Sequence, residues 1–570
     1  MMKLRNRKRK EYIEMCQEQF DDMYHFYQKL GYTDQQCDKF TSSCFGADIR
    51  IRNDVPYNHN WDLRRKEDRP PVDFSINYFA PTKMARTRMP MPTEEICFDM
   101  GAAIPCAAPQ EPEWNTAETK NVPETEISSP LDKPQMIFSA NVNTASWSYI
   151  RNKISTGNRI DPNFVRIEEI INSYRYHLKK PEKDQLFSIS AEHSECPWNQ
   201  NSELLLIGLK GKKADKKVQQ NLCFLVDVSG SMSDQWLLVQ MSLAAIISKL
   251  GKKDIISIIA YSDKTVTIAK KMNCGNIDKC IDAVLSIDGI GGCTYGSEGL
   301  ENAYAYLSDH YKKDANNRLF IFTDGDFNFG ITSESGLSDY IYQKRQTGIY
   351  LSIVGYGAGN FKDNKMEALA ENGNGNYTFV GNPEDVLDNL WDKLISNLVT
   401  IAKDVKISVE LNPYYVKEYR LIGYDARVLT QKEFHDTEKA ADGIGSEHNV
   451  IALIEFKKGT ADLTYSTRYV SHKSKDNKDE FAFIEIHYKT PDNIDSVMTC
   501  SIGINDLNNK TDNIKIAALL AAFGLYIKSS AYKGSLDIPM LRKLLSEAKP
   551  ENYDKYSHFG IIHQYMQYDT

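Results

Sequence analysis

LCFLVDVSGSMS, residues 222–233, is the stretch that decides the fold. Five apolar residues, 222–226, lead to Asp227, and a short turn with several polar residues then runs into an apolar helical pattern that ends near Leu250. An apolar run of this length, followed by a turn and a helix, is typical of a buried strand in an α/β sheet.

The alternation of strand and helix continues from Asn221 to about Ser396. Further apolar strands are predicted in IISIIAY (255–261), RLFIFTD (318–324) and YLSIVGY (350–356), and amphipathic helical patterns lie between and after them. Such alternation predicts a parallel sheet covered on both faces. We therefore expect a doubly wound, Rossmann-like α/β domain over residues 216–400.

The two flanks of this domain have a different pattern. Residues 135–215 predict helices between Thr144 and Tyr176 and then strands, whereas after Thr400 apolar and polar residues alternate, as in half-exposed antiparallel strands. Residues 401–570 close with two predicted helices, 513–530 and 539–548. We expect both flanks to form one β-sandwich-like domain with C-terminal helices, into which the α/β domain is inserted.

The N-terminal part divides into two further regions. Residues 1–67 form a helical region of unknown role, with one helix predicted over 10–30. Prolines and acidic residues recur in residues 68–134, which predicts a disordered linker.

Composition limits the class of protein. A chain of 570 residues with 41% hydrophobic and 26% charged residues is typical of a globular protein with more than one domain. The net charge of −8 argues against nucleic acid as a partner, and the basic run RNRKRK (5–10) is too short to change this. The eleven cysteines form no metal-binding pattern. The longest apolar run, 516–527, is too short to span a membrane, and the first thirty residues lack a secretory signal, so we expect a cytoplasmic protein.

Polar side chains follow the predicted strands at the edge where open α/β sheets bind ligands. Asp227, Ser229 and Ser231 follow the first strand, with Gly230 expected to permit a tight turn. Thr294 lies in the Gly-rich loop GIGGCTYGS, and Asp324 follows the strand LFIF. Taken singly, the hydroxyl groups could be helix caps and the aspartate part of an ordinary turn.

Taken together, these five side chains predict a metal site. Carboxylates and hydroxyls are hard oxygen donors, which favour Mg²⁺ or Mn²⁺. Three neutral hydroxyls and two carboxylates neutralise the ion only partly, so it stays electrophilic. We expect one coordination position to be left for a carboxylate of a binding partner.

DVSGSM, GGCT and TDGDFN resemble the metal-ion-dependent adhesion site of von Willebrand factor A (VWA) domains. The resemblance is closer to the bacterial YfbK-like group, and it covers the chain from about Pro134 onward. Its flanking signatures are FSANVNTASWSYIR (138–151), VRIEEIIN (165–172), CPWN (196–199), GYGAGN (355–360), NGNGNY (372–377), VTIAKDVKISVELNP (399–413) and YRLIGYD (419–425).

The resemblance implies roles for the site residues. Ser229, Ser231 and Thr294 would ligate the ion directly, and Asp227 and Asp324 would do so directly or through water. The group usually has acidic residues where this chain has Asn141 and Asn143, which puts any role of those charges in doubt.

The resemblance implies a metal-dependent protein-binding protein and not an enzyme. One alternative is a scaffold in which the ion only holds loops together, and another is a Mg²⁺-dependent hydrolase with Asp227 as nucleophile. Phosphoryl-accepting hydrolases carry a second acid two residues after the nucleophile, where this chain has Ser229, and SGSMS does not match the serine-hydrolase pattern G-x-S-x-G. A dinucleotide loop at Gly355, Gly357 and Gly359 has Asn360 in place of the third glycine of the motif.

Overall fold

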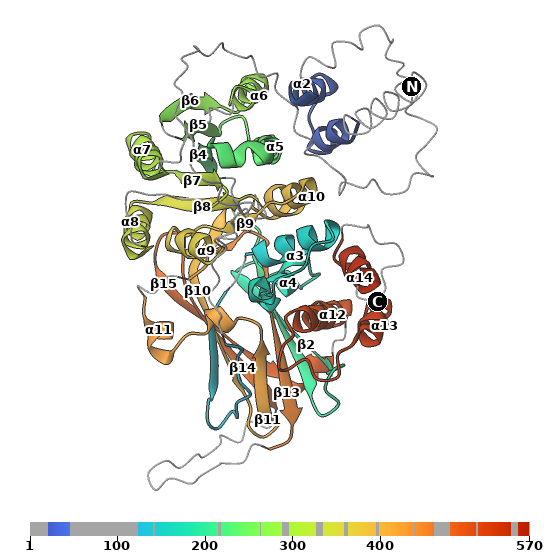
Figure 1. The fold of residues 1–570 in the computed structure, drawn as a ribbon. Helices are drawn as coiled ribbons and strands as arrows, with labels where there is room; N and C mark the ends of the chain where they lie inside the picture. Colours follow the sequence, from blue (N-terminus) through green and yellow to red (C-terminus); the bar gives the residue numbers. More distant parts are fainter. Residues whose placement is uncertain are drawn as a thin grey trace, which may run out of the picture.

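The structure of the protein is a computed structural model. It describes residues 21–45, 123–140, 143–214, 218–262, 264–287, 296–325, 334–357, 363–394, 398–437, 441–460, 479–508, 511–548 and 557–568. Figure 1 shows the α/β domain above a second body, in which long antiparallel strands carry a group of helices on one side.

The α/β domain is built on a six-stranded sheet with the order β6-β5-β4-β7-β8-β9. Its strands are β4 (Gln219–Asp227), β5 (Ile255–Tyr261), β6 (Thr265–Asn273), β7 (Ala315–Thr323), β8 (Ile349–Gly355) and β9 (Tyr377–Phe379). All neighbours are parallel except β5 and β6. The short connection 262–264 allows β6 only to return antiparallel, so the sheet is mixed and not wholly parallel as predicted.

Both faces of this sheet are covered, as a doubly wound domain requires. Successive residues of β4 alternate between two cores: Leu222, Phe224 and Val226 pack with α5 and α6, whereas Cys223 and Leu225 pack with α7, α8 and α9. These helices are α5 (Trp236–Lys249), α6 (Ile277–Leu285), α7 (Gly296–Asp309), α8 (Glu334–Gln346) and α9 (Asp363–Asn372). The domain ends with the short α10 (Pro383–Asp385) and the π-helix η5 (Val386–Leu394).

The flanks form two antiparallel sheets that share one apolar core. The first contains β1 (Gln135–Ser139), β10 (Thr400–Leu411), β12 (Ile444–Gly445), β14 (Glu480–Lys489) and β15 (Asp495–Gly503). The second contains β2 (Phe187–Glu195), β3 (Glu203–Gly211), β11 (Val416–Ile422) and β13 (Asn449–Lys458). In both sheets, strands from before the α/β domain pair with strands from after it: β1 with β10, and β3 with β13.

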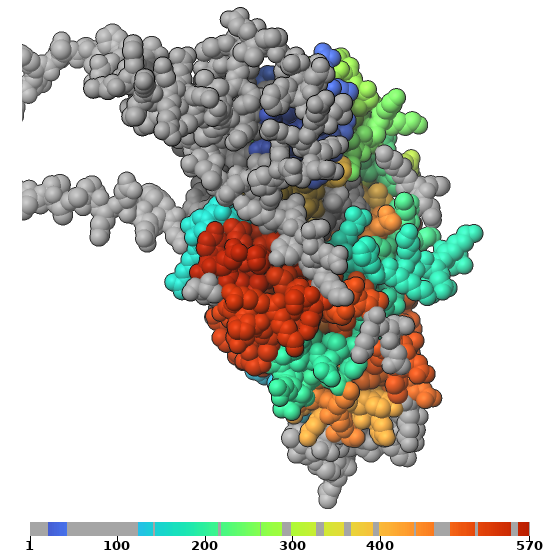
Figure 2. Space-filling view, turned by 90° about the vertical axis from the view of Figure 1, so that its right-hand side faces the viewer, coloured from blue at the N-terminus to red at the C-terminus, as the bar shows by residue number. Residues whose placement is uncertain are grey.

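Helices from both flanks gather on one side of the second sheet. They are α3 (Ala145–Ser155), α4 (Ile167–Ser173), α12 (Asp512–Ile527), α13 (Ile538–Glu547) and α14 (His558–Tyr568). Of these helices, α4 and α12 contact the strands of the sheet, and the others pack against these two or against each other. Their apolar faces join the core that also lies under α7 to α9. Figure 2 shows the C-terminal helices side by side on this side of the sheet. The sequence analysis predicted α12 and α13 but not α14. The apolar run 516–527 is buried within α12, and no described helix combines the length and apolar character needed to cross a membrane.

The described N-terminal residues pack against the α/β domain. Residues 21–29 and α2 (Asp34–Phe45) are helical, and the rings of Tyr27 and Phe40 stack with centroids 4.2 Å apart. The Tyr32 hydroxyl donates to the Ala244 carbonyl of α5 at 2.8 Å. The remainder of the region 1–67 lies outside the described residues.

The end of the predicted linker lies against the flank. Ser128 forms an isolated bridge with Tyr419, and the Thr125 N–H donates to the Asp425 carboxylate at 2.8 Å. Thr125 and Ser128, which lie within the predicted linker, are therefore hydrogen-bonded to the flank. Residues 68–122 of the predicted linker lie outside the described residues.

Candidate metal centre

Asp227 is the last residue of β4, and its neighbours in the sheet are fixed by the strand register. β5 pairs Tyr261 directly with Asp227, and β7 pairs Phe322 with Val226, which brings Thr323 beside Asp227. The side chains of Asp227, Tyr261 and Thr323 are all fully buried. The carboxyl edge of the sheet therefore holds one carboxylate between two hydroxyl groups.

The carboxylate of Asp227 receives neutral hydrogen-bond donors. Its Oδ1 accepts from the Ser229 N–H at 2.9 Å, and its Oδ2 accepts from the hydroxyls of Tyr261 at 3.1 Å and Thr323 at 3.4 Å. Burial and, to a smaller extent, the nearby Asp324 raise the pKa of Asp227 to about 6, although the hydrogen bonds from Ser229 and Tyr261 oppose the rise. A buried carboxylate in this environment would be stabilised by a cation.

The two serines lie next to this carboxylate. Ser229 precedes the short 3₁₀-helix η4 (Gly230–Gln235), and the Ser229 and Ser231 hydroxyl oxygens are 3.0 Å apart. Neither hydroxyl caps a backbone N–H of η4 or α5. Gly230 does not have the left-handed φ that would require glycine, and a Cβ there would meet no atom within 4 Å, so the expected role of Gly230 in the turn is not borne out.

The remaining predicted ligands are Asp324 and Thr294. Asp324 directly follows β7 and is 8% exposed, and its charge acts on Asp227. Gly325, with φ of +95°, turns the chain away, and its N–H donates to the Thr323 hydroxyl at 3.1 Å. Thr294 lies outside the described residues. The structure thus brings four of the five predicted side chains to one edge of the sheet.

These four residues fit a hard cation in their chemistry. Two carboxylates and two hydroxyls offer only oxygen, which suits Mg²⁺ or Mn²⁺. Within the described part of the chain, no three His, Cys, Asp or Glu side chains gather as they would around an ion held by acids and histidines alone. Among the described residues, a metal site at this edge would therefore draw on the serines as well as the two aspartates.

Two residues of the site were missed by the sequence analysis, namely Tyr261 and Thr323. Each is the terminal residue of a predicted strand, in IISIIAY and RLFIFT. Their position at strand ends was a usable signal, because parallel strands adjacent to β4 place their last residues beside Asp227. The order of the strands was needed to apply it.

Two glycines of the alternative dinucleotide loop are described. A Cβ at Gly355 would lie 2.9 Å from the Tyr377 hydroxyl oxygen, so this glycine allows close packing, whereas Gly357 has a left-handed φ of +87° that favours glycine. Gly359 lies outside the described residues.

A second, partly buried carboxylate lies where α9 meets the flank. Glu367 forms an ion pair with Arg427, its Oε2 lies 3.3 Å from Arg166 Nη2, and its Oε1 accepts from the Asn143 amide at 3.1 Å. Burial alone would raise the pKa of Glu367, but Arg166 and Arg427 lower it to about 2. Asn143 also accepts from the Tyr377 N–H at 3.2 Å, so an amide at this position serves both partners, whereas Asn141 lies outside the described residues.

Comparison with known proteins agrees with this architecture. Residues 221–393 match the von Willebrand factor type A domain, residues 396–563 match the family described as the C-terminal part of uncharacterized protein YfbK, and residues 113–206 match a family described as von Willebrand factor. A VWA domain suggests a role in protein interaction or scaffolding, and such domains often bind a divalent metal.

Individual proteins are similar over different lengths. Uncharacterized protein YfbK of Escherichia coli K12 is 30% identical over 457 residues, which cover 77% of this chain and 79% of YfbK. Uncharacterized protein sll0103 of a Synechocystis species is 24% identical over 198 residues, 34% of this chain and 45% of the relative. Among solved structures, a von Willebrand factor type A protein of Catenulispora acidiphila is 12% identical with a TM-score of 0.37, covering 64% of this chain and 88% of that protein. The chain belongs to the YfbK family of VWA-domain proteins.

Proposed function

We propose that this chain is a divalent-metal-dependent protein-binding protein and not an enzyme. Its ion, Mg²⁺ or Mn²⁺, is held by Asp227, Ser229, Ser231, Thr294 and Asp324, and an open coordination position accepts an Asp or Glu side chain of a partner protein. One observation carries the proposal: the buried Asp227 carboxylate, with only neutral hydrogen-bond donors, lies beside two neighbouring serine hydroxyls.

The chain's own residues define what the site does. The N–H of Ser229 and the hydroxyls of Tyr261 and Thr323 orient the Asp227 carboxylate, which leaves its remaining lone pairs for an ion. The serines add neutral ligands, so the ion keeps much of its positive charge. When bound, the ion supplies a Lewis-acidic position for an incoming carboxylate.

The pairing of β1 with β10 and of β3 with β13 supports the interpretation of the flanks as one β-sandwich-like domain. In that arrangement the α/β domain is an insertion in the flank domain. Strands from before and after the insertion pair with each other, and the flank domain carries the sheet edge that holds the candidate metal site. We propose that the flanks act as the rigid support of the binding edge.

The test uses the full chain and an array of immobilised peptides that contain single Asp or Glu residues, each beside its Asn or Gln counterpart. In millimolar Mg²⁺, the protein should bind a subset of acidic peptides and not their amide counterparts. EDTA or Asp227→Ala should abolish this binding. Asp309→Ala, which removes an exposed acid from the last turn of α7, is the matched control and should bind as the parent does.

Binding that survives both EDTA and Asp227→Ala would contradict the proposal. If Asp227→Ala lowers the thermal stability in Mg²⁺ while no peptide binds to any variant, the ion is structural and the scaffold alternative holds.

A further inference from the structure

A cavity of about 310 Å³ lies where the α/β domain meets the flank. It opens between η5, the ends of α3 and α4, the start of α14 and the turn before β13. Its wall includes Trp147, Ser173, Arg175, Lys210, Asp388 and His558. None of these residues belongs to the candidate metal centre.

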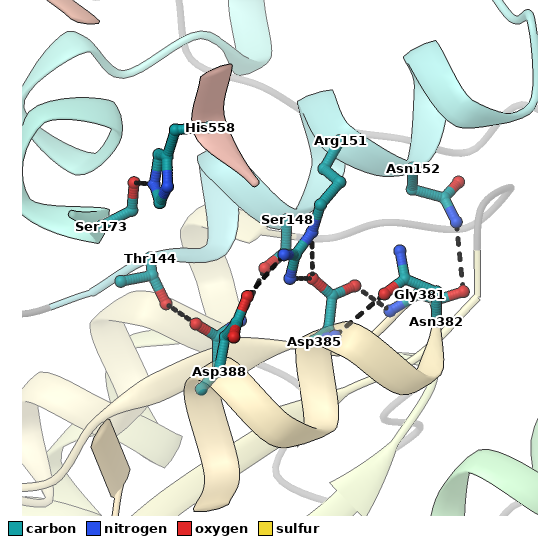
Figure 3. A network of polar contacts seen from close by, with 11 residues as sticks. Thr144, Ser148, Arg151, Asn152, Ser173, Gly381, Asn382, Asp385, Asp388 and His558 are labelled. Carbon is teal, nitrogen blue, oxygen red and sulfur yellow. Dashed lines mark hydrogen bonds and ion pairs between the residues drawn. The ribbon is translucent and has the colours of Figure 1, made fainter. Parts of the chain in front are cut away.

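One wall of the cavity is aromatic and firmly held. The His558 ring stacks on Trp147 with centroids 4.3 Å apart and planes 7° from parallel. Figure 3 shows His558 beside Ser173, with His558 Nε2 2.6 Å from the Ser173 hydroxyl oxygen. The Ser173 hydroxyl donates to the Ile170 carbonyl at 2.7 Å, so His558 Nε2 carries the hydrogen of the bond between them. Ser173 is therefore not arranged as a nucleophile, and the wall is suited to binding.

The polar side chains on the wall formed by the α/β domain are paired with other side chains of the protein. Arg151 binds Asp385 and also Asp388, whose Oδ2 lies 2.6 Å from Arg151 Nη1. The Asn389 side chain bonds both to Thr144, at 3.1 Å, and to Ser148, at 2.7 Å. Figure 3 shows this network along the helix that carries Asp385 and Asp388. Its polar groups are largely occupied by one another.

Lys210 and Arg175 form the cationic side of the cavity, and their side chains are not paired in this way. Within the described residues, neither Lys210 nor Arg175 forms an ion pair with an acid, and the Lys210 ammonium donates to the main-chain oxygen of Glu447 at 2.6 Å. Burial lowers the pKa of Lys210, the nearby Glu447 opposes this, and Arg175 and Lys180 add to the lowering. Two acids, Glu447 and Asp388, also line the cavity, and Asp388 is paired with Arg151. The cavity wall therefore carries two cations that no carboxylate of the described residues binds directly.

We propose that this cavity binds a small ligand with a phosphate or carboxylate group, which Lys210 and Arg175 hold, while the rest of the ligand lies against Trp147 and His558. An oxyanion would relieve the repulsion between the cations and form charge-assisted hydrogen bonds with both. Because residues of η5 and of both flanks line the cavity, the ligand joins the two bodies. The inference uses no residue of the metal centre and stands apart from the proposed function.

The test measures thermal unfolding of the full chain after a chelating resin has removed divalent ions. Inorganic phosphate and succinate are compared with sodium chloride at equal ionic strength. At ten times its dissociation constant, a bound ligand stabilises the fold enough to raise Tm by about 2 °C. A rise with phosphate alone assigns a phosphate group to the ligand, and a rise with succinate alone assigns a carboxylate.

The variant Lys210→Met with Arg175→Gln should lose the rise in Tm. Lys515→Met with Lys543→Met, which removes two exposed lysines of α12 and α13, should keep it. If the first double variant does not fold, Arg175→Gln alone changes an exposed residue and should weaken the effect. No rise above sodium chloride with either anion, or an equal rise in the folded Lys210→Met variant, would overturn the proposal.

Discussion

Asp227 is fully buried and the Glu367 side chain is 12% exposed, and the charges of these two carboxylates have opposite surroundings. Glu367 faces two guanidinium groups and an amide, which lower its pKa to about 2, whereas Asp227 receives only neutral donors, and burial raises its pKa to about 6. A charge that is neutralised within the protein holds the α/β domain to the flank. The charge of Asp227 has no ionic partner within the protein, so binding of a cation from solution would stabilise it.

The largest effect is expected at the neutralised carboxylate. Arg427→Met leaves Glu367 and its neighbour Asp442 short of a partner, and breaking a buried ion pair in this way should lower the free energy of unfolding by about 3 kcal/mol. Urea unfolding monitored by circular dichroism measures the loss. The control Lys432→Met, at an exposed site on the short helix α11 (Gln431–His435), should change little. Surface substitutions usually change the free energy of unfolding by less than about 0.5 kcal/mol. A loss in that range for Arg427→Met would contradict the claim that Arg427 neutralises Glu367.

The next effect is a dependence on pH. The folded-state pKa of Glu367 is lowered from 4.5 to about 2, so its contribution to stability is complete above pH 4.5 and is lost as the pH falls toward 2. At pH 7 the free energy of unfolding of the parent should exceed that of Glu367→Gln by about 2 kcal/mol, and this difference should shrink at pH 3. Urea unfolding of both proteins at the two pH values gives this difference. A gap that stays constant would show that the charge of Glu367 is not involved.

A smaller effect of opposite sign is expected at Asp227. In metal-free buffer near pH 7.5, Asp227→Asn removes a buried charge without an ionic partner and should raise the free energy of unfolding by about 1 kcal/mol. The same unfolding measurement on Glu367→Gln, which should be destabilised, is the matched comparison. If Asp227→Asn is destabilised as much as Glu367→Gln, the two carboxylates do not differ as described.

The smallest effect concerns the residue that orients Asp227. Tyr261→Phe removes a hydroxyl that donates to Oδ2 and should weaken Mn²⁺ binding by about tenfold, as expected for a partner that positions a ligand. Isothermal titration calorimetry measures the change. Tyr304→Phe, which changes a buried tyrosine of α7, should bind Mn²⁺ as the parent does. Equal affinity in Tyr261→Phe would remove the proposed role of the hydroxyl.

The sequence predicted the parts of the molecule that depend on local pattern. The apolar run before Asp227 and the polar residues after it placed four described site residues at one edge, because parallel strands end together. β10 and β13 were also predicted from local pattern, but their pairing with β1 and β3 connects segments more than 200 residues apart, which no local periodicity reveals. The expectation that both flanks share one body came from the order of the elements and not from any pairing signal.

The remaining features arise from tertiary structure. The neutral surroundings of Asp227 depend on which strands lie beside β4, and the contacts of Glu367 depend on where α9 meets Arg166 and Arg427. The π-helical geometry of η5, which was predicted as an ordinary helix, accompanies the bonds that Asp385, Asp388 and Asn389 make to α3. Side-chain contacts of this kind cannot be inferred from spacing along the chain.

The most direct test of the central claim is a titration of the metal-free full chain with Mn²⁺, followed by the electron paramagnetic resonance signal of the free ion. The account predicts that the parent and Glu367→Gln each take up one ion per chain, and that Asp227→Asn binds it at least about 100-fold more weakly. No uptake by the folded parent, or the same uptake by Asp227→Asn, would contradict it.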